Sequence, residues 1–107
     1  MSKLNVTYKG NKYELEYTRK SVRTMENQGF NINDISEKPM TTLPALFRGA
    51  FYAHHKALKS DLIDEMFNSM TKKDELIGVL ASMYAEPYAE LLNDPIENEE
   101  NATWAKA

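Results

Sequence analysis

The sequence contains no cysteine, which excludes disulfide bonds, thiolate metal sites and cysteine nucleophiles. It also contains no apolar run near the roughly 20 residues that a membrane-spanning helix requires. Its first ten residues lack the apolar stretch of a secretory signal peptide. We therefore expect a chain that works in the cytoplasm, where it is made.

Residue combinations typical of catalytic sites are missing as well. The only two histidines are His54 and His55. Neighbours on a helix point about 100° apart, so one metal ion does not readily bind both. Asp61, Asp64 and Glu65 fall in the first turns of a predicted helix. Carboxylates there interact favourably with the positive end of the helix dipole, which explains them without a catalytic role. The four glycines are scattered and form no phosphate-binding loop. We therefore expect neither an enzyme nor a cofactor or metal site.

A modest net charge of −3 conceals a gradient along the chain. Residues 1–60 carry ten Lys or Arg and five Asp or Glu, a balance of +5, whereas residues 61–107 carry three and eleven, a balance of −8. Opposite charges on two ends favour head-to-tail contacts, which build rings or open spirals rather than two-fold dimers. We expect salt-sensitive self-association, with these candidate residues: Lys9, Lys12, Arg19, Lys20, Arg23, Glu86 and Glu90.

The first residues predict a β-hairpin. Apolar and polar residues alternate over residues 3–17, on either side of the sequence KGNK at residues 9–12. With Gly-Asn at its centre, this turn is expected to be of type II′ and to pair Tyr8 with Tyr13. That register places six apolar side chains on one face: Leu4, Val6, Tyr8, Tyr13, Leu15 and Tyr17.

Helical signals follow the hairpin. Thr18 is the expected N-cap of a helix that ends near Gln28. Gly29 and Phe30 then form a Schellman motif in which Phe30 folds back onto Met25.

A second helix is expected to begin near Thr41 or Thr42, with Pro44 in its first turn. Its apolar stripe continues as far as Leu58. Gly49 lies inside this stripe, where it would let another backbone approach closely.

Ser60 is the expected cap of a third helix. Thr71 and Asp74 resemble a capping box that opens a fourth. Pro87 breaks or kinks that helix, and residues 88–92 continue as a last short one.

Together these signals predict an α+β, mostly helical fold, in which an N-terminal hairpin of about residues 3–17 packs on four to five short helices. Residues 1–95 form a single domain, and residues 96–107 form a flexible, disordered acidic tail. The tail contains the lone tryptophan, Trp104, which is either a short docking motif or an incidental residue.

Methionines and aromatic residues are concentrated on the second to fourth predicted helices. Methionine-rich helical faces adapt to several partners, although the same residues also fill ordinary cores. We expect part of this set to be exposed as a partner-binding groove formed by Phe51, Tyr52, Met66, Phe67 and Met70.

Beyond single residues, the chain has a distinctive order of segments. The hairpin is followed by TRKSVRTMENQGF, KPMTTLPALFRGAFYAHH, LIDEMFNSM and LIGVLASMYAEPYAELL. In this order, over residues 3–95, the sequence resembles the tail assembly chaperones of long-tailed phages of Gram-positive bacteria. The shared positions are packing and capping positions rather than catalytic ones.

This resemblance implies a non-enzymatic helper that acts in the cytoplasm of the bacterial host and is absent from the mature virion. Such chaperones keep the long tape-measure protein soluble and help to recruit the tail-tube protein. An amphipathic helix of the tape-measure protein would lie in the predicted groove. Two alternatives stay open: a small phage regulator that binds nucleic acid through the basic half, and a minor connector component of the virion.

Overall fold

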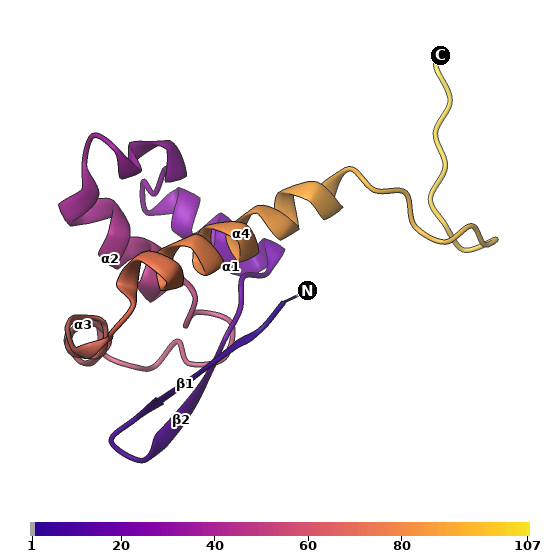
Figure 1. Cartoon of the computed structure of the whole chain (residues 1–107). Helices are drawn as coiled ribbons and strands as arrows, with labels where there is room; N and C mark the ends of the chain where they lie inside the picture. Colours follow the sequence, from indigo (N-terminus) through magenta and orange to yellow (C-terminus); the bar gives the residue numbers. More distant parts are fainter. Residues whose placement is uncertain (1) are drawn as a thin grey trace.

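The computed structural model describes residues 2–107, which form a β-hairpin, a short 3₁₀ helix and four α-helices (Figure 1). Their order is β1 Leu4–Tyr8, β2 Asn11–Leu15, α1 Arg19–Asn27, η1 Ile32–Ile35, α2 Pro39–Gly49, α3 Ser60–Ser69 and α4 Lys73–Leu91. This arrangement confirms the predicted mostly helical α+β fold with its N-terminal hairpin.

The hairpin differs from the prediction in its register. Tyr8 lies opposite Asn11 rather than opposite Tyr13, so the pairing is shifted by two residues. A shift of two keeps every side chain on its original face, because side chains alternate with a period of two. Val6 and Leu15 are therefore buried as expected, although they are no longer paired with each other.

The turn explains the shift. Its central residues are Lys9 and Gly10, with φ angles of 49° and 81°. Two positive φ angles define a type I′ turn, whose twist matches that of the flanking strands. The predicted type II′ turn at Gly10 and Asn11 is wrong, since Asn11 is already the first residue of β2.

Two buried hydrogen bonds join the end of the hairpin to the end of α2. The backbone N–H of Glu16 donates to the carbonyl of Ala50 over 3.1 Å. The hydroxyl of Tyr17 donates to the carbonyl of Leu46 over 2.6 Å. Burial, with a smaller effect from Tyr84, raises the pKa of Tyr17 above its ordinary value.

The predicted caps of α1 are confirmed. The Thr18 side chain accepts a hydrogen bond from the N–H of Ser21, and the Ser21 side chain accepts one from the N–H of Thr18. At the other end, Gly29 has a φ of 89° and the N–H of Phe30 donates to the carbonyl of Met25 over 3.0 Å. This bond is the signature of a Schellman motif.

Helix α2 begins earlier and ends earlier than predicted. Pro39 is its first residue, a position where proline's missing N–H costs nothing. The α-helix ends at Gly49, and residues 50–54 form turns. The prediction of a helical stripe that reaches Leu58 is therefore wrong. The carbonyl of Ala50 is bonded to the hairpin instead of to a following turn of helix.

Gly49 does permit a close approach, but the approaching group is a side chain rather than a backbone. A Cβ added to Gly49 would lie 2.3 Å from the sulfur of Met25. The buried Met25 side chain therefore occupies the space that any larger residue would need.

The later helices also differ from the prediction at their ends. Ser60 is the first residue of α3 rather than its cap. Lys72, with a φ of 54°, is the N-cap of α4 and makes no side-chain capping bond, so the capping box of Thr71 does not form. Helix α4 then continues for 19 residues through Pro87, which is buried, so no separate last helix exists among residues 2–107.

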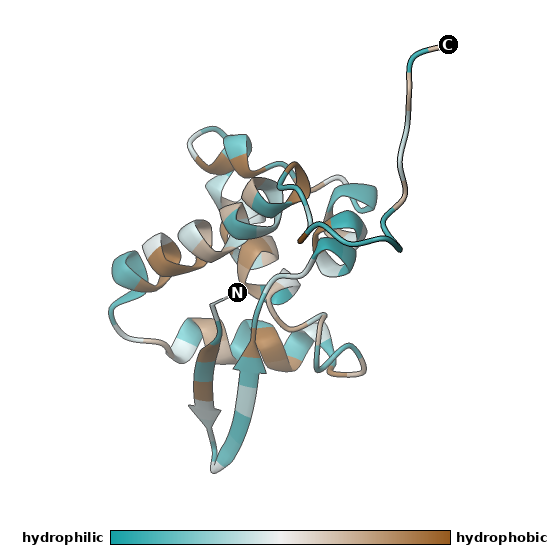
Figure 2. Cartoon of the chain, turned by 90° about the vertical axis from the view of Figure 1, so that its right-hand side faces the viewer, coloured by the Kyte–Doolittle hydropathy of each residue, from teal (hydrophilic) through white to brown (hydrophobic). Residues whose placement is uncertain are grey.

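The core lies between the hairpin and the four helices, with α2 in contact with η1, α1, α3 and α4. No helix among residues 2–107 is long and apolar enough to cross a membrane. Beyond Leu92 the chain forms neither helix nor strand and turns at residues 99–101. It is largely hydrophilic and stands away from the body (Figure 1, Figure 2). The disorder of this segment stays a prediction.

Candidate functional site

The five predicted partner-binding residues do not form one surface. Phe51 and Met66 are completely buried in the core, which corrects the expectation that they line an exposed groove. Tyr52, Phe67 and Met70 are half-buried. The hydroxyl of Tyr52 donates to the Gln28 side chain over 2.8 Å, on the side of α1.

Phe67 lines a shallow groove between α2 and α3, called here the α2/α3 groove. Its volume is about 400 Å³, and its apolar lining consists of Met40, Pro44 and Phe67. Met40 is 90% exposed, which is unusual for so large an apolar side chain. Polar groups also line it, including Arg48 and Asp64, whose side chains are 2.9 Å apart.

The two histidines fasten the hairpin to the segment after α2. The Nε2 atom of His54 lies 2.8 Å from a carboxylate oxygen of Glu16 and 3.4 Å from one of Glu14. The Nε2 atom of His55 accepts a hydrogen bond from the backbone N–H of Glu14 over 3.1 Å. Both imidazoles thus have structural contacts. Residues 2–107 contain no group of three or more His, Cys, Asp or Glu that could hold a metal ion.

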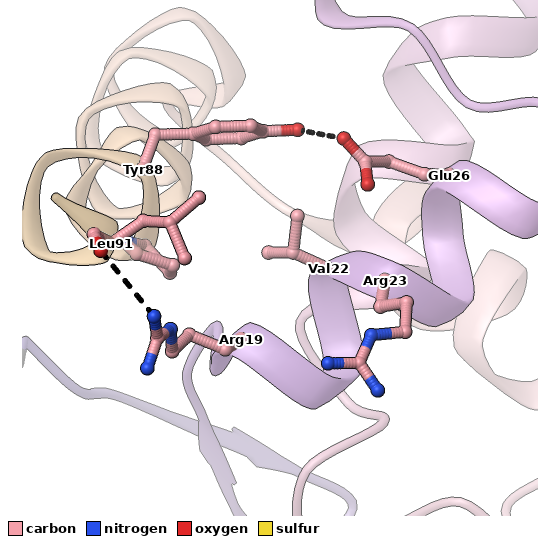
Figure 3. A pocket seen from close by; sticks show the side chains of 7 residues that line it. Arg19, Val22, Arg23, Glu26, Tyr88 and Leu91 are labelled. Atoms are coloured by element: carbon pink, nitrogen blue, oxygen red, sulfur yellow. Dashed lines mark hydrogen bonds between the residues drawn. The ribbon is translucent and has the colours of Figure 1, made fainter. Parts of the chain in front are cut away.

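A second groove, the α1/α4 groove, lies between α1 and the last turns of α4 (Figure 3). It has a volume of about 390 Å³. Val22 and Pro87 are buried, and Leu91 faces Val22 from the opposite wall. Arg19 and Arg23 lie on the rim.

Two hydrogen bonds tie the walls of this groove together (Figure 3). The Arg19 guanidinium donates to the carbonyl of Leu91 over 3.5 Å. Because α4 has no basic residue in its last turn, Arg19 supplies the positive charge that favours that end of the helix dipole. The Tyr88 hydroxyl donates to Glu26. Partial burial and the bonds to Glu26 and Tyr84 raise the pKa of Tyr88.

The predicted self-association residues are dispersed. Arg19 and Arg23 line the α1/α4 groove, whereas Lys20 lines a different hollow, next to His54. At the hairpin turn, Lys9 lies 3.7 Å from Glu65 and Lys12 is exposed.

The acidic candidates on α4 lie on the same helix that packs against α1. Glu86 accepts hydrogen bonds from the backbone N–H and hydroxyl of Ser2, and these bonds lower the pKa of Glu86. Glu90 is exposed. The basic and acidic halves are thus partly folded together, and the acidic charge that projects freely is in the segment after α4: Asp94, Glu97, Glu99 and Glu100.

Comparison with protein families gives one match, which covers residues 1–107. The matching family is DUF5055, a domain of unknown function. The chain belongs to the DUF5055 family. Comparisons with curated proteins and with solved structures give no match.

In this member of DUF5055, reasoning from the sequence did not find the α1/α4 groove, although it had selected Arg19 and Arg23 by charge. The missing information is the packing of α1 on α4, which brings Val22 next to Leu91 across more than sixty positions of sequence. Met40 was also overlooked. Its exposure depends on which helices pack around the first turn of α2, and no local sequence pattern records that.

Proposed function

We propose that the chain is a non-enzymatic tail assembly chaperone that holds an apolar helical segment of the tape-measure protein in the α2/α3 groove. The observation that carries this proposal is the exposure of Met40 beside Phe67 and Pro44. The sequence resemblance supplies the identity of the client and of the tail-tube protein, whose recruitment the chaperone helps.

The lining of the groove suits a helical client. Methionine is flexible and polarizable, so Met40 can adapt to different apolar side chains of a helix. Phe67 is supported from behind by the ring of Phe47, 5.2 Å away between centroids. The Arg48–Asp64 pair at the same groove offers both signs of charge to the polar flank of an amphipathic helix.

Binding rather than catalysis is supported by the contacts of the histidines. His54 is bonded to Glu16, whose side chain is only 11% exposed, and His55 is bonded to the backbone of Glu14. Each ring uses its Nε2 atom to hold the hairpin in place, which gives both histidines a structural role.

Co-expression with the tape-measure protein of the same phage tests the proposal. The chain should increase the soluble fraction of the tape-measure protein, and Met40→Glu should abolish this increase because it places a charge in the apolar groove. Val79→Glu is the matched control, since Val79 is exposed on α4 and does not line the groove. Circular dichroism should show both variants folded.

An unchanged soluble fraction with the wild-type chain would refute the proposed function. Equal loss with Met40→Glu and Val79→Glu would refute the α2/α3 groove as the binding site.

We also propose that the chain acts in the host cytoplasm and leaves before the virion is complete. Mass spectrometry of purified particles should therefore not detect it, and its detection there would favour a connector component instead.

A further inference from the structure

The α1/α4 groove combines an apolar floor with a rim that carries two arginines and one carboxylate, Glu26, which is already bonded to Tyr88. Val22 and Leu91 face each other across it, and Arg19 and Arg23 flank them (Figure 3). Arg19 and Arg23 are four residues apart on α1, so they lie on one face of the helix. The first turn of α1 contains no acidic residue, so its positive dipole end is not offset by its own side chains.

The segment that follows Leu92, residues 93–107, has the complementary chemistry. It includes residues 96–107, predicted above as a tail, and the whole segment is called the tail from here on. It carries the four carboxylates named above, two of them as the adjacent pair Glu99 and Glu100. Its large apolar residues are Ile96 and Trp104, each 89% exposed. Tryptophan is enriched among the residues that anchor protein interfaces, and here it lies four residues after the acidic pair.

The tail is directed away from the groove of its own molecule. It leaves the end of α4 and extends outward from the body (Figure 1). Pro95 restricts Asp94 to extended backbone conformations, which opposes a tight reversal at the exit. Within the tail, hydrogen bonds are local, such as that from the Asn101 side chain to the carbonyl of Ile96 over 3.0 Å.

The overall dimensions agree with a projecting tail. The radius of gyration is 16.3 Å, whereas a compact chain of this length has about 13 Å. A projecting segment is available to another molecule.

We propose that the α1/α4 groove of one copy binds the tail of a second copy, with Trp104 inserted between Val22 and Leu91 and with Glu99 and Glu100 facing the rim arginines. Because groove and tail are different surfaces, the contact is heterologous and extends into rings or open chains. The contact requires no client, so it can be tested independently of the proposed function.

Trp104 is the only tryptophan, so tryptophan fluorescence reports the environment of this one side chain. In the wild-type chain the emission should shift to shorter wavelength as protein concentration rises, while sedimentation shows species above the monomer mass. Added salt should reverse both changes because the carboxylate–arginine attraction is screened. Leu91→Glu should weaken self-association by about tenfold or more, as expected for loss of an anchor contact. Val79→Glu, with the same change of charge on the same helix, should not.

A mixing experiment separates contact between copies from contact within one chain. Trp104→Ala retains the groove and lacks the anchor, whereas Leu91→Glu retains the anchor and lacks the groove. Each variant alone should be monomeric. Mixing them should shift the emission of the Leu91→Glu chain, because its Trp104 then enters the intact groove of the other variant.

Two results would overturn the proposal. An emission shift that is independent of concentration and unchanged by mixing would mean that the tail folds onto its own groove. An emission typical of water-exposed tryptophan at every concentration would mean that the tail does not bind the groove at all.

Discussion

On the hairpin side of the core, polar groups are bonded inside the molecule, whereas along the last turns of α4 apolar groups face outward. Tyr17, fully buried, donates to a carbonyl at the end of α2. Tyr88 and Leu91 are 45% and 53% exposed. The first region is closed by specific contacts that stabilise the fold, and the second retains a surface that other chains can cover.

The comparison is tested most strongly by truncating one apolar side chain in each region. Phe51→Ala should lower the free energy of unfolding by about 3–5 kcal/mol, because it leaves a cavity in the core. Leu91→Ala should lower it by much less, since half of that side chain already faces water. Urea unfolding measured at low protein concentration checks both. If the two losses are similar, the distinction between a closed and an open region fails.

Removing one hydroxyl from each region should give an intermediate effect. Tyr17→Phe should cost about 1–3 kcal/mol, because it leaves the carbonyl of the buried Leu46 without its donor. Tyr88→Phe should cost at most about 1 kcal/mol, since water can replace its exposed bond to Glu26.

Alkaline titration tests the buried hydroxyl of Tyr17 in a second way. Burial raises the pKa of Tyr17 in the folded state. The wild-type chain should therefore lose stability as the pH rises above about 10, the pKa of tyrosine in an unfolded chain. Tyr17→Phe should lose less over the same range, and an identical pH dependence would contradict the role given to this hydroxyl.

The smallest effects are expected from a pair of glycine substitutions. Gly49→Ala should destabilise the protein by about 1–2 kcal/mol, because the new methyl group meets Met25 and alanine's helix propensity offsets only part of that overpacking. Gly78→Ala has open space around it and should stabilise α4 by about 0.5–1 kcal/mol. Thermal unfolding should move the two melting temperatures in opposite directions, and a shift in the same direction would disprove the close packing at Gly49.

Local sequence patterns were sufficient where the deciding contacts are local. The N-cap at Thr18 and the positive φ of Gly29 depend on residues within one helical turn, and both were predicted correctly. The alternation of the hairpin correctly assigned its buried face. Its register was wrong because two turn types were compatible with the same four residues, and both keep the apolar side chains on one face.

Distant contacts decided the rest. Helix α2 stops at Gly49, and the carbonyl of Ala50 that follows bonds to the hairpin, a contact that no periodicity records. Pro87 remains inside α4 although proline disfavours helix, and its burial shows that packing outweighs that preference. For the candidate sites, composition indicated exposed methionine and aromatic residues but did not distinguish the buried Phe51 from the half-buried Phe67.

The amino-acid sequence by itself determined the fold class, the caps of α1 and the opposite charges of the two halves, because each follows from residue type and short-range spacing. Tertiary structure alone decided which apolar side chains are exposed and where the charges meet. Burial depends on contacts between residues far apart in sequence. The packing of α1 against α4 places Arg19 and Arg23 beside an apolar groove, whereas the acidic residues after α4 lie outside that packing.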